Sequence, residues 1–107
     1  MAFTRKKLAF IQLPSSKGDI YDPPASTKGL IQNILLHNAN TVSETVVLYL
    51  HDGTNEYVIY QVTMAVNATL QLEFAGAGLV VDASSKLTGY TTTASKVTCS
   101  VSGTEET

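Results

Sequence analysis

The stretch of residues 29–60 limits the possible fold of this chain most strongly. It contains or begins three short runs rich in β-branched and aliphatic residues, at residues 30–37, 45–51 and 57–64. Clusters of turn-forming residues separate the runs, and Asp52-Gly53 is a strong hairpin signal. Strands of this length with turns between them predict a β-meander. No stretch of the chain shows a helical pattern of apolar residues as strong as this strand pattern. The sequence therefore predicts an all-β domain centred on this meander.

Further short runs with strand character surround the meander. The run at residues 70–74 alternates most clearly, since Leu70, Leu72 and Phe74 share one face and the residues between them are polar. The other predicted strands are residues 8–13, 79–81, 86–93 and 95–101, of which the last two are expected to form a pair. Residues 75–78 predict a bend, and Asp82 opens a predicted turn. The pattern predicts an antiparallel two-sheet β-sandwich or jelly roll of about seven or eight strands.

Charge and proline content divide the chain into three parts. Residues 1–28 hold all three prolines and five basic against two acidic residues, a net charge of +3. They predict an extended basic N-terminal arm that continues into a proline-rich connector. Residues 29–103 form the predicted sandwich body, and residues 104–107 form a short acidic tail that is expected to be frayed. From residue 29 onward, two basic residues stand against seven acidic ones, a net charge of −5.

The arm is the predicted partner-binding segment. Such arms reach acidic protein surfaces or nucleic acid, and a solvated tail without a partner is the third interpretation. The three adjacent cations have no interleaved aromatic residues, which favours a protein partner over nucleic acid. Ile20 and Tyr21 are expected to anchor the connector onto the body. The predicted partner-binding residues are Arg5, Lys6, Lys7, Leu8, Phe10, Ile11, Leu13, Ile20 and Tyr21.

The sequence contains no recognisable signature of catalysis, of a cofactor site or of a metal site. The only histidines, His37 and His51, are predicted not to face each other across a hairpin. Residues 76–78 (Gly-Ala-Gly) lack the following helix of a phosphate-binding loop, and no serine stands in a nucleophile elbow. The sequence therefore predicts a non-enzymatic protein with no cofactor and no metal ion.

The single cysteine and the five tyrosines are interpreted as structural residues. Cys99 alternates with Val97 and Val101 on one face of a predicted strand, so it is expected to be a small buried apolar group. A single cysteine excludes an intramolecular disulfide, which agrees with assembly inside a cell. The tyrosines are interpreted as surface or interface residues, and a sugar-binding groove is the alternative. They are Tyr21, Tyr49, Tyr57, Tyr60 and Tyr90.

The N-terminus imitates an export signal only in part. Three basic residues precede an apolar run, but this run is short, contains Gln12 and stops at Pro14. No run in the chain approaches the length needed to span a bilayer. Neither export nor membrane insertion is therefore expected.

The order of segments between residues 20 and 103 carries a resemblance. Ile20-Tyr21 and a proline-rich step lead to GLIQNILLHNANTVSETVVLYL, in which a strand ends in an asparagine-rich turn and a TVVLYL strand follows. A short hairpin comes next and is followed by VNATLQLEF, and GLVVDASSKLTGYTTTASKVTCSVSG then ends in KVTCSVSG at residues 96–103. This order resembles a small β-sandwich module of virion structural proteins of tailed bacteriophages. The chain departs from that pattern where residues 76–78 and Asp82 replace a Gly-Asp turn before the penultimate strand.

The resemblance implies a non-enzymatic, oligomeric part of a phage particle, assembled in the host cytoplasm. A capsid decoration (cement) protein would clamp neighbouring major capsid subunits with its N-terminal arm, through strand addition and through the charges of Arg5, Lys6 and Lys7. A tail, neck or fibre component is the alternative within the virion. A carbohydrate-binding or adhesin module is the alternative from another class of protein, and an enzyme ranks behind both. Other virion subunits are the expected partners.

Overall fold

The computed structural model describes residues 3–76 and 78–106, and for residues 3–6 it describes the backbone alone. Ala77 of the predicted bend and Thr107 of the predicted tail lie outside these ranges. Within them the chain forms nine strands and no helix. The strands are β1 (Phe3–Gln12), β2 (Gly18–Tyr21), β3 (Lys28–Asn38), β4 (Glu44–His51), β5 (Glu56–Met64), β6 (Thr69–Glu73), β7 (Leu79–Val81), β8 (Lys86–Thr91) and β9 (Val97–Glu106).

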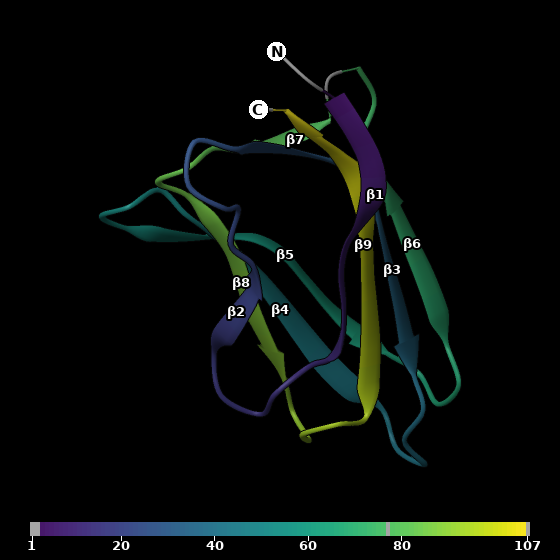
Figure 1. Ribbon diagram of the computed structural model, residues 1–107. Helices are drawn as coiled ribbons and strands as arrows, with labels where there is room; N and C mark the ends of the chain where they lie inside the picture. Colours follow the sequence, from purple (N-terminus) through teal and green to yellow (C-terminus); the bar gives the residue numbers. More distant parts are fainter. Residues whose placement is uncertain (1–2, 77, 107) are drawn as a thin grey trace.

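The strands form two antiparallel sheets that pack face to face (Figure 1). The five-stranded sheet has the order β1-β9-β3-β6, and β7 also pairs with β3 beyond the end of β6. The four-stranded sheet has the order β2-β8-β4-β5. The prediction of an all-β, two-sheet β-sandwich is therefore confirmed. The described chain has nine strands instead of seven or eight, because β2 adds a strand that was not predicted to the one expected at residues 8–13.

Alternating side chains from both sheets form the core. Leu36 of β3, Leu48 of β4 and Leu87 of β8 are fully buried, as expected for apolar side chains on the facing surfaces of a sandwich. The predicted inward face of β6 is confirmed, because Leu70, Leu72 and the following Phe74 pack against this core. The other buried apolar residues of the core are Leu13, Ile20, Tyr21, Ile31, Ile34, Val46, Met64, Val81, Val97, Cys99 and Val101.

The predicted pairing of the first two strands of the meander is wrong. β4 pairs with β5, as predicted, and with β8, but it does not pair with β3. Instead, β3 pairs with β6, β7 and β9, so the loop after Asn38 crosses from one sheet to the other. The buried side chain of Asn38 fixes this crossing, since its Nδ2 donates to the carbonyl oxygens of Val42, Met64 and Ala65.

The predicted pairing of the last two strands is also wrong. β8 lies in the four-stranded sheet and β9 in the five-stranded sheet. The turn between them is held by the segment after β1: the amide of Thr91 donates to the carbonyl of Pro14, and the amide of Ser95 donates to that of Leu13. Ser95 adopts a positive φ of 64°, which reverses the chain between the two sheets.

The described part of residues 1–28 is extended, as predicted, but it does not project away from the body. β1 pairs along its length with β9, and β2 pairs with β8. The tail is not frayed up to Glu106, because β9 continues to that residue. Glu105 is nearly buried there, and its Oε2 accepts a hydrogen bond of 2.6 Å from the Tyr21 hydroxyl. The first and the last described segments of the chain, β1 and the end of β9, are thus parts of the sandwich.

Candidate interaction surfaces

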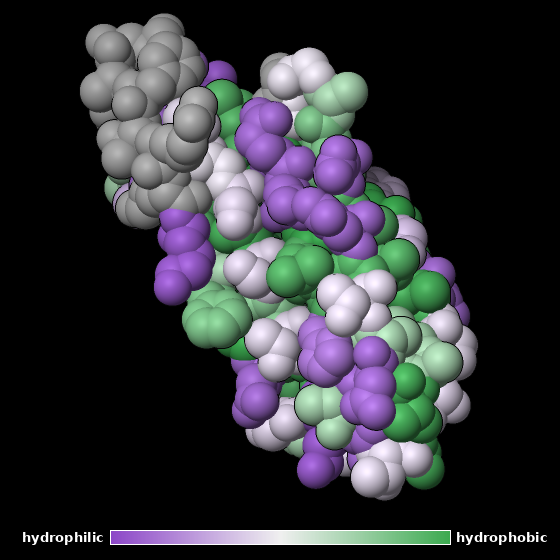
Figure 2. Space-filling model, turned by 90° about the vertical axis from the view of Figure 1, so that its right-hand side faces the viewer, coloured by the Kyte–Doolittle hydropathy of each residue, from purple (hydrophilic) through white to green (hydrophobic). Residues whose placement is uncertain are grey.

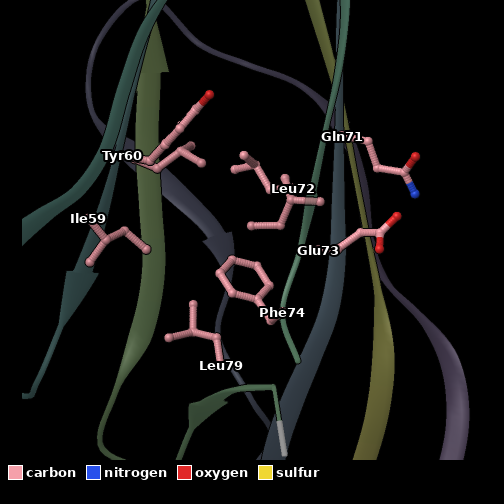
Figure 3. A pocket seen from close by; sticks show the side chains of 9 residues that line it. Ile59, Tyr60, Gln71, Leu72, Glu73, Phe74 and Leu79 are labelled. Carbon is pink, nitrogen blue, oxygen red and sulfur yellow. The ribbon is translucent and has the colours of Figure 1, made fainter. Parts of the chain in front are cut away.

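The sandwich is open on the side where β5 and β6 end their sheets. A cavity of about 270 Å³ lies between these two strands. Figure 3 shows Leu72, Phe74 and Leu79 pointing across the gap toward Ile59 and Tyr60, whereas Gln71 and Glu73 point away from it. Ile34 and Leu48, both fully buried, complete the lining. The cavity therefore lies directly beside the hydrophobic core.

The two strands that border the cavity each have a free edge. Among the described residues β5 pairs only with β4, and β6 pairs only with β3. Tyr57, Val58 and Ile59 are exposed one after another on β5, at 56%, 53% and 39% of their full accessible surface. The register of β5 with β4 shifts between Tyr60 and Val58, which marks a bulge at this edge. Free edges with apolar side chains are sites of pairing with other chains.

The opposite side of the sandwich is formed by β1 and β2, and it contains most of the predicted partner-binding residues. Leu13, Ile20 and Tyr21 are buried in the core, so they hold the sandwich together and are not accessible to a partner. Leu8 and Ile11 are half-buried against the same core. Lys7 and Phe10 are the accessible members: Phe10 is 62% exposed, and the Lys7 Nζ lies 4.9 Å from the centroid of its ring. The side chains of Arg5 and Lys6 lie outside the described part of the chain.

Figure 2 looks onto the side of the molecule on which the five-stranded sheet lies. Polar and apolar side chains are interspersed over this face, and no single apolar area dominates the view. Phe10 and the 40% exposed Leu35 belong to one cross-strand row, with Ser100 between them. The lateral edges are therefore better candidates for an interaction surface than this face of the sheet.

A polar and aromatic cluster lies on the four-stranded sheet, and sequence reasoning missed it. Lys17 forms an ion pair with Glu56, and its Nζ lies 4.8 Å from the centroid of the Tyr49 ring. The rings of Tyr49 and Tyr90 are stacked, with centroids 6.2 Å apart. The hydrogen bond with Glu56 raises the pKa of Lys17, and the same bond lowers the pKa of Glu56. Alternation on single strands could have placed the tyrosines on one face, but only the sheet order shows that β4 and β8 are neighbours.

The residues considered for chemistry occupy structural positions. Cys99 is fully buried, as predicted, and burial raises the pKa of its thiol to about 12, so the reactive thiolate is suppressed. The predicted turn at Asp82 is confirmed, since its Oδ1 accepts hydrogen bonds from the Ser84 amide and the Ser85 hydroxyl. His37 and His51 lie in different sheets. The described residues contain no cluster of three or more His, Cys, Asp or Glu that could hold a metal ion.

No protein-family model, curated protein or solved structure matches this chain. Within the described ranges, no helix is long and apolar enough to cross a membrane.

A buried carboxylate connects the turns at one end of the sandwich through hydrogen bonds. Glu44 is 1% exposed and accepts hydrogen bonds from the Asn40 side chain, the Thr91 hydroxyl and the Thr93 amide. Burial alone would raise the pKa of Glu44, but these hydrogen bonds outweigh it and hold the pKa below its ordinary value. The carboxylate is thus the form that stabilises the fold.

We expect Glu44→Gln to lower the free energy of unfolding at pH 7 by about 1–3 kcal/mol, because an amide NH₂ would face the donors that the carboxylate now satisfies. Since the folded pKa lies below the unfolded one, the stabilisation by Glu44 is present above the unfolded pKa and is lost as the pH falls through the folded pKa. Urea unfolding at several pH values should therefore show a flatter acid dependence for the variant. Glu73→Gln, which changes an exposed carboxylate, is the control. Equal stability of the Glu44 variant and the native protein at pH 7 would contradict this account.

Proposed function

We propose that this chain is a non-enzymatic structural protein of a bacteriophage virion, and specifically a capsid decoration (cement) protein. In this proposal it holds neighbouring major capsid subunits through its N-terminal segment and is present in many copies on one particle. The segment order of residues 20–103 supports the phage assignment by resemblance. The small sandwich with free lateral edges supports a role in assembly.

The observation that carries the proposal is the position of β1 at an edge of the five-stranded sheet. Among the described residues β1 pairs with β9 alone, so its outer backbone groups are available for strand addition to another subunit. The sequence places Arg5, Lys6 and Lys7 on this strand, and these positive charges would guide it toward an acidic surface. The clamp is thus a folded edge strand and not a free arm.

Electron microscopy of particles from the producing culture, labelled with an antibody raised against this chain, tests the assignment. A cement protein should give label over the whole head. Label confined to one vertex or to the tail would contradict the cement role and favour a neck, tail or fibre component. Particles without any label, from a culture in which the chain is detected by immunoblot, would contradict the virion role altogether.

A second candidate function rests on the cluster of Lys17, Glu56 and the stacked Tyr49 and Tyr90. Aromatic rings beside charged hydrogen-bonding groups are typical of surfaces that bind sugars, so the cluster favours a carbohydrate-binding or adhesin module. Binding to a glycan array that is lost in Tyr90→Ala and kept in Tyr57→Ala, which changes an exposed tyrosine of β5, would favour this function.

A further inference from the structure

We propose that copies of this chain associate head to tail, with β1 of one copy adding antiparallel to β6 of the next copy. The two strands are the opposite edges of the same five-stranded sheet. Their pairing would therefore continue this sheet from copy to copy without using any surface twice. The inference rests on the proposed function, in which many copies lie side by side on one particle. It assigns the strand addition of β1 to β6 of the next copy, because the free edge of β1 cannot pair with a strand of another protein at the same time.

The register of the proposed contact follows if the cross-strand rows of the sheet continue straight into the next copy. Lys7 of β1 pairs with Ser102 of β9, Ser102 pairs with Asn33 of β3, and Asn33 pairs with Glu73 of β6. One row therefore carries Lys7 at one edge and Glu73 at the other. When the rows continue into a second copy, the lysine of one copy lies opposite the glutamate of the next. An exposed cation and an exposed carboxylate then form a cross-strand pair.

The same register matches the inward faces of the two strands. The next inward row runs from Ala9 through Val101 and Ile34 to Leu72. Ile11 and Leu70 end another such row, and all four of these edge residues pack against the core. In the proposed contact Ala9 and Ile11 lie opposite Leu72 and Leu70 of the next copy. A slip by one residue would turn these apolar side chains to the solvent face, and a slip by two would separate Lys7 from Glu73, so the two features together specify the register.

Formal charge favours the antiparallel direction of this contact. Residues 1–13 contain three basic residues and no acidic ones, whereas residues 52–85, which include β5, β6 and β7, contain four acidic residues and no basic ones. The basic residues lie in the first half of β1, and Glu73 is the last residue of β6. Antiparallel addition places these ends together, whereas parallel addition would place the cations beside Thr69. The attraction between the two edges is thus greatest in the antiparallel arrangement.

The other two lateral edges are less suited to continuous pairing. β2 has only four residues, and its register with β8 already shifts. β5 has a bulge near Ile59, and its one carboxylate, Glu56, is bound to Lys17 of the same chain. Since β1 and β6 are different surfaces, their contact is heterologous and produces a closed ring or an open filament, not a two-fold dimer.

Sedimentation velocity of the full chain over a range of concentrations tests this interface. We expect reversible association of the native protein. Lys7→Glu and Glu73→Lys should each raise the concentration needed for association by about tenfold, because like charges then face each other. The double variant Lys7→Glu/Glu73→Lys should restore association, and so should an equimolar mixture of the two single variants. Circular dichroism melts at concentrations below those of association should be alike for all variants, since both side chains are exposed in the single chain.

A native protein that stays monomeric at all accessible concentrations would overturn this interface. An oligomer that neither single variant weakens, or that the double variant fails to restore, would also overturn it by showing that other surfaces associate. These outcomes are separable from failure of the proposed function, because label on phage particles is measured independently of self-association.

Discussion

A chain that lacks residues 1–13 is expected to lose its cooperative fold. The deletion removes β1 and its pairing with β9, and it removes Leu13, which is fully buried. Loss of one fully buried leucine side chain alone costs about 2–5 kcal/mol, and domains of this size are stable by only about 5–15 kcal/mol. The free energy of unfolding should fall close to zero. Thermal melting and the dispersion of amide NMR signals would show the loss.

A shorter deletion of residues 1–6 is the matched control. It leaves Leu8, Ile11 and Leu13 in place, together with the pairing of β1 from Lys7 onward, so this variant should fold with a lower melting temperature. A chain without residues 1–13 that melts as cooperatively as the full chain would contradict the structure. Such a result would indicate that residues 1–13 form an arm that is not needed for folding.

Gly103→Ala is expected to destabilise the protein by about 3 kcal/mol or more, at the upper end of the cost of overpacking. A Cβ atom at Gly103 would lie 2.0 Å from the carbonyl oxygen of Leu30, which is a backbone atom of the neighbouring strand and cannot rotate away. β9 would have to separate from β3 beside the register shift at Ile31. Chemical denaturation of the variant measures this cost.

Gly76→Ala is the control for the glycine substitution. Gly76 has a positive φ of 67°, but a Cβ atom there would meet no atom within 4 Å. Its substitution should cost only the strain of the left-handed conformation, about 1–2 kcal/mol. Equal stability of the two variants would contradict this account, because it would show that the close approach of β3 and β9 does not exclude a side chain at Gly103.

Local patterns in the sequence determine most strands but not their partners. The predicted strand at residues 79–81 agrees with β7, and the predicted hairpin of β4 and β5 is present. Alternation tells which side chains face inward, but it does not tell which strand lies beside another. The crossing after β3 depends on bonds from Asn38 to Met64 and Ala65, which are far away in the sequence. These bonds leave no local signal.

The candidate surfaces depend on the same long-range information. Basic residues and prolines at the N-terminus suggested a separate arm, because the strand character of residues 8–13 was visible but its partner β9 was not. A register shift between Lys7 and Ala9 also interrupts the alternation that would have revealed a longer strand. The cavity between β5 and β6 exists because these two strands end their sheets, and strand order cannot be read from either strand alone.

Hydrogen exchange of the β6 backbone amides, measured at low and at high protein concentration, tests most directly that this chain assembles through its lateral edges. We predict that the β6 amides that do not bond to β3 become protected at high concentration, and that Lys7→Glu removes this protection. Unchanged exchange of β6 in an associated sample, or protection confined to β5, would contradict the account.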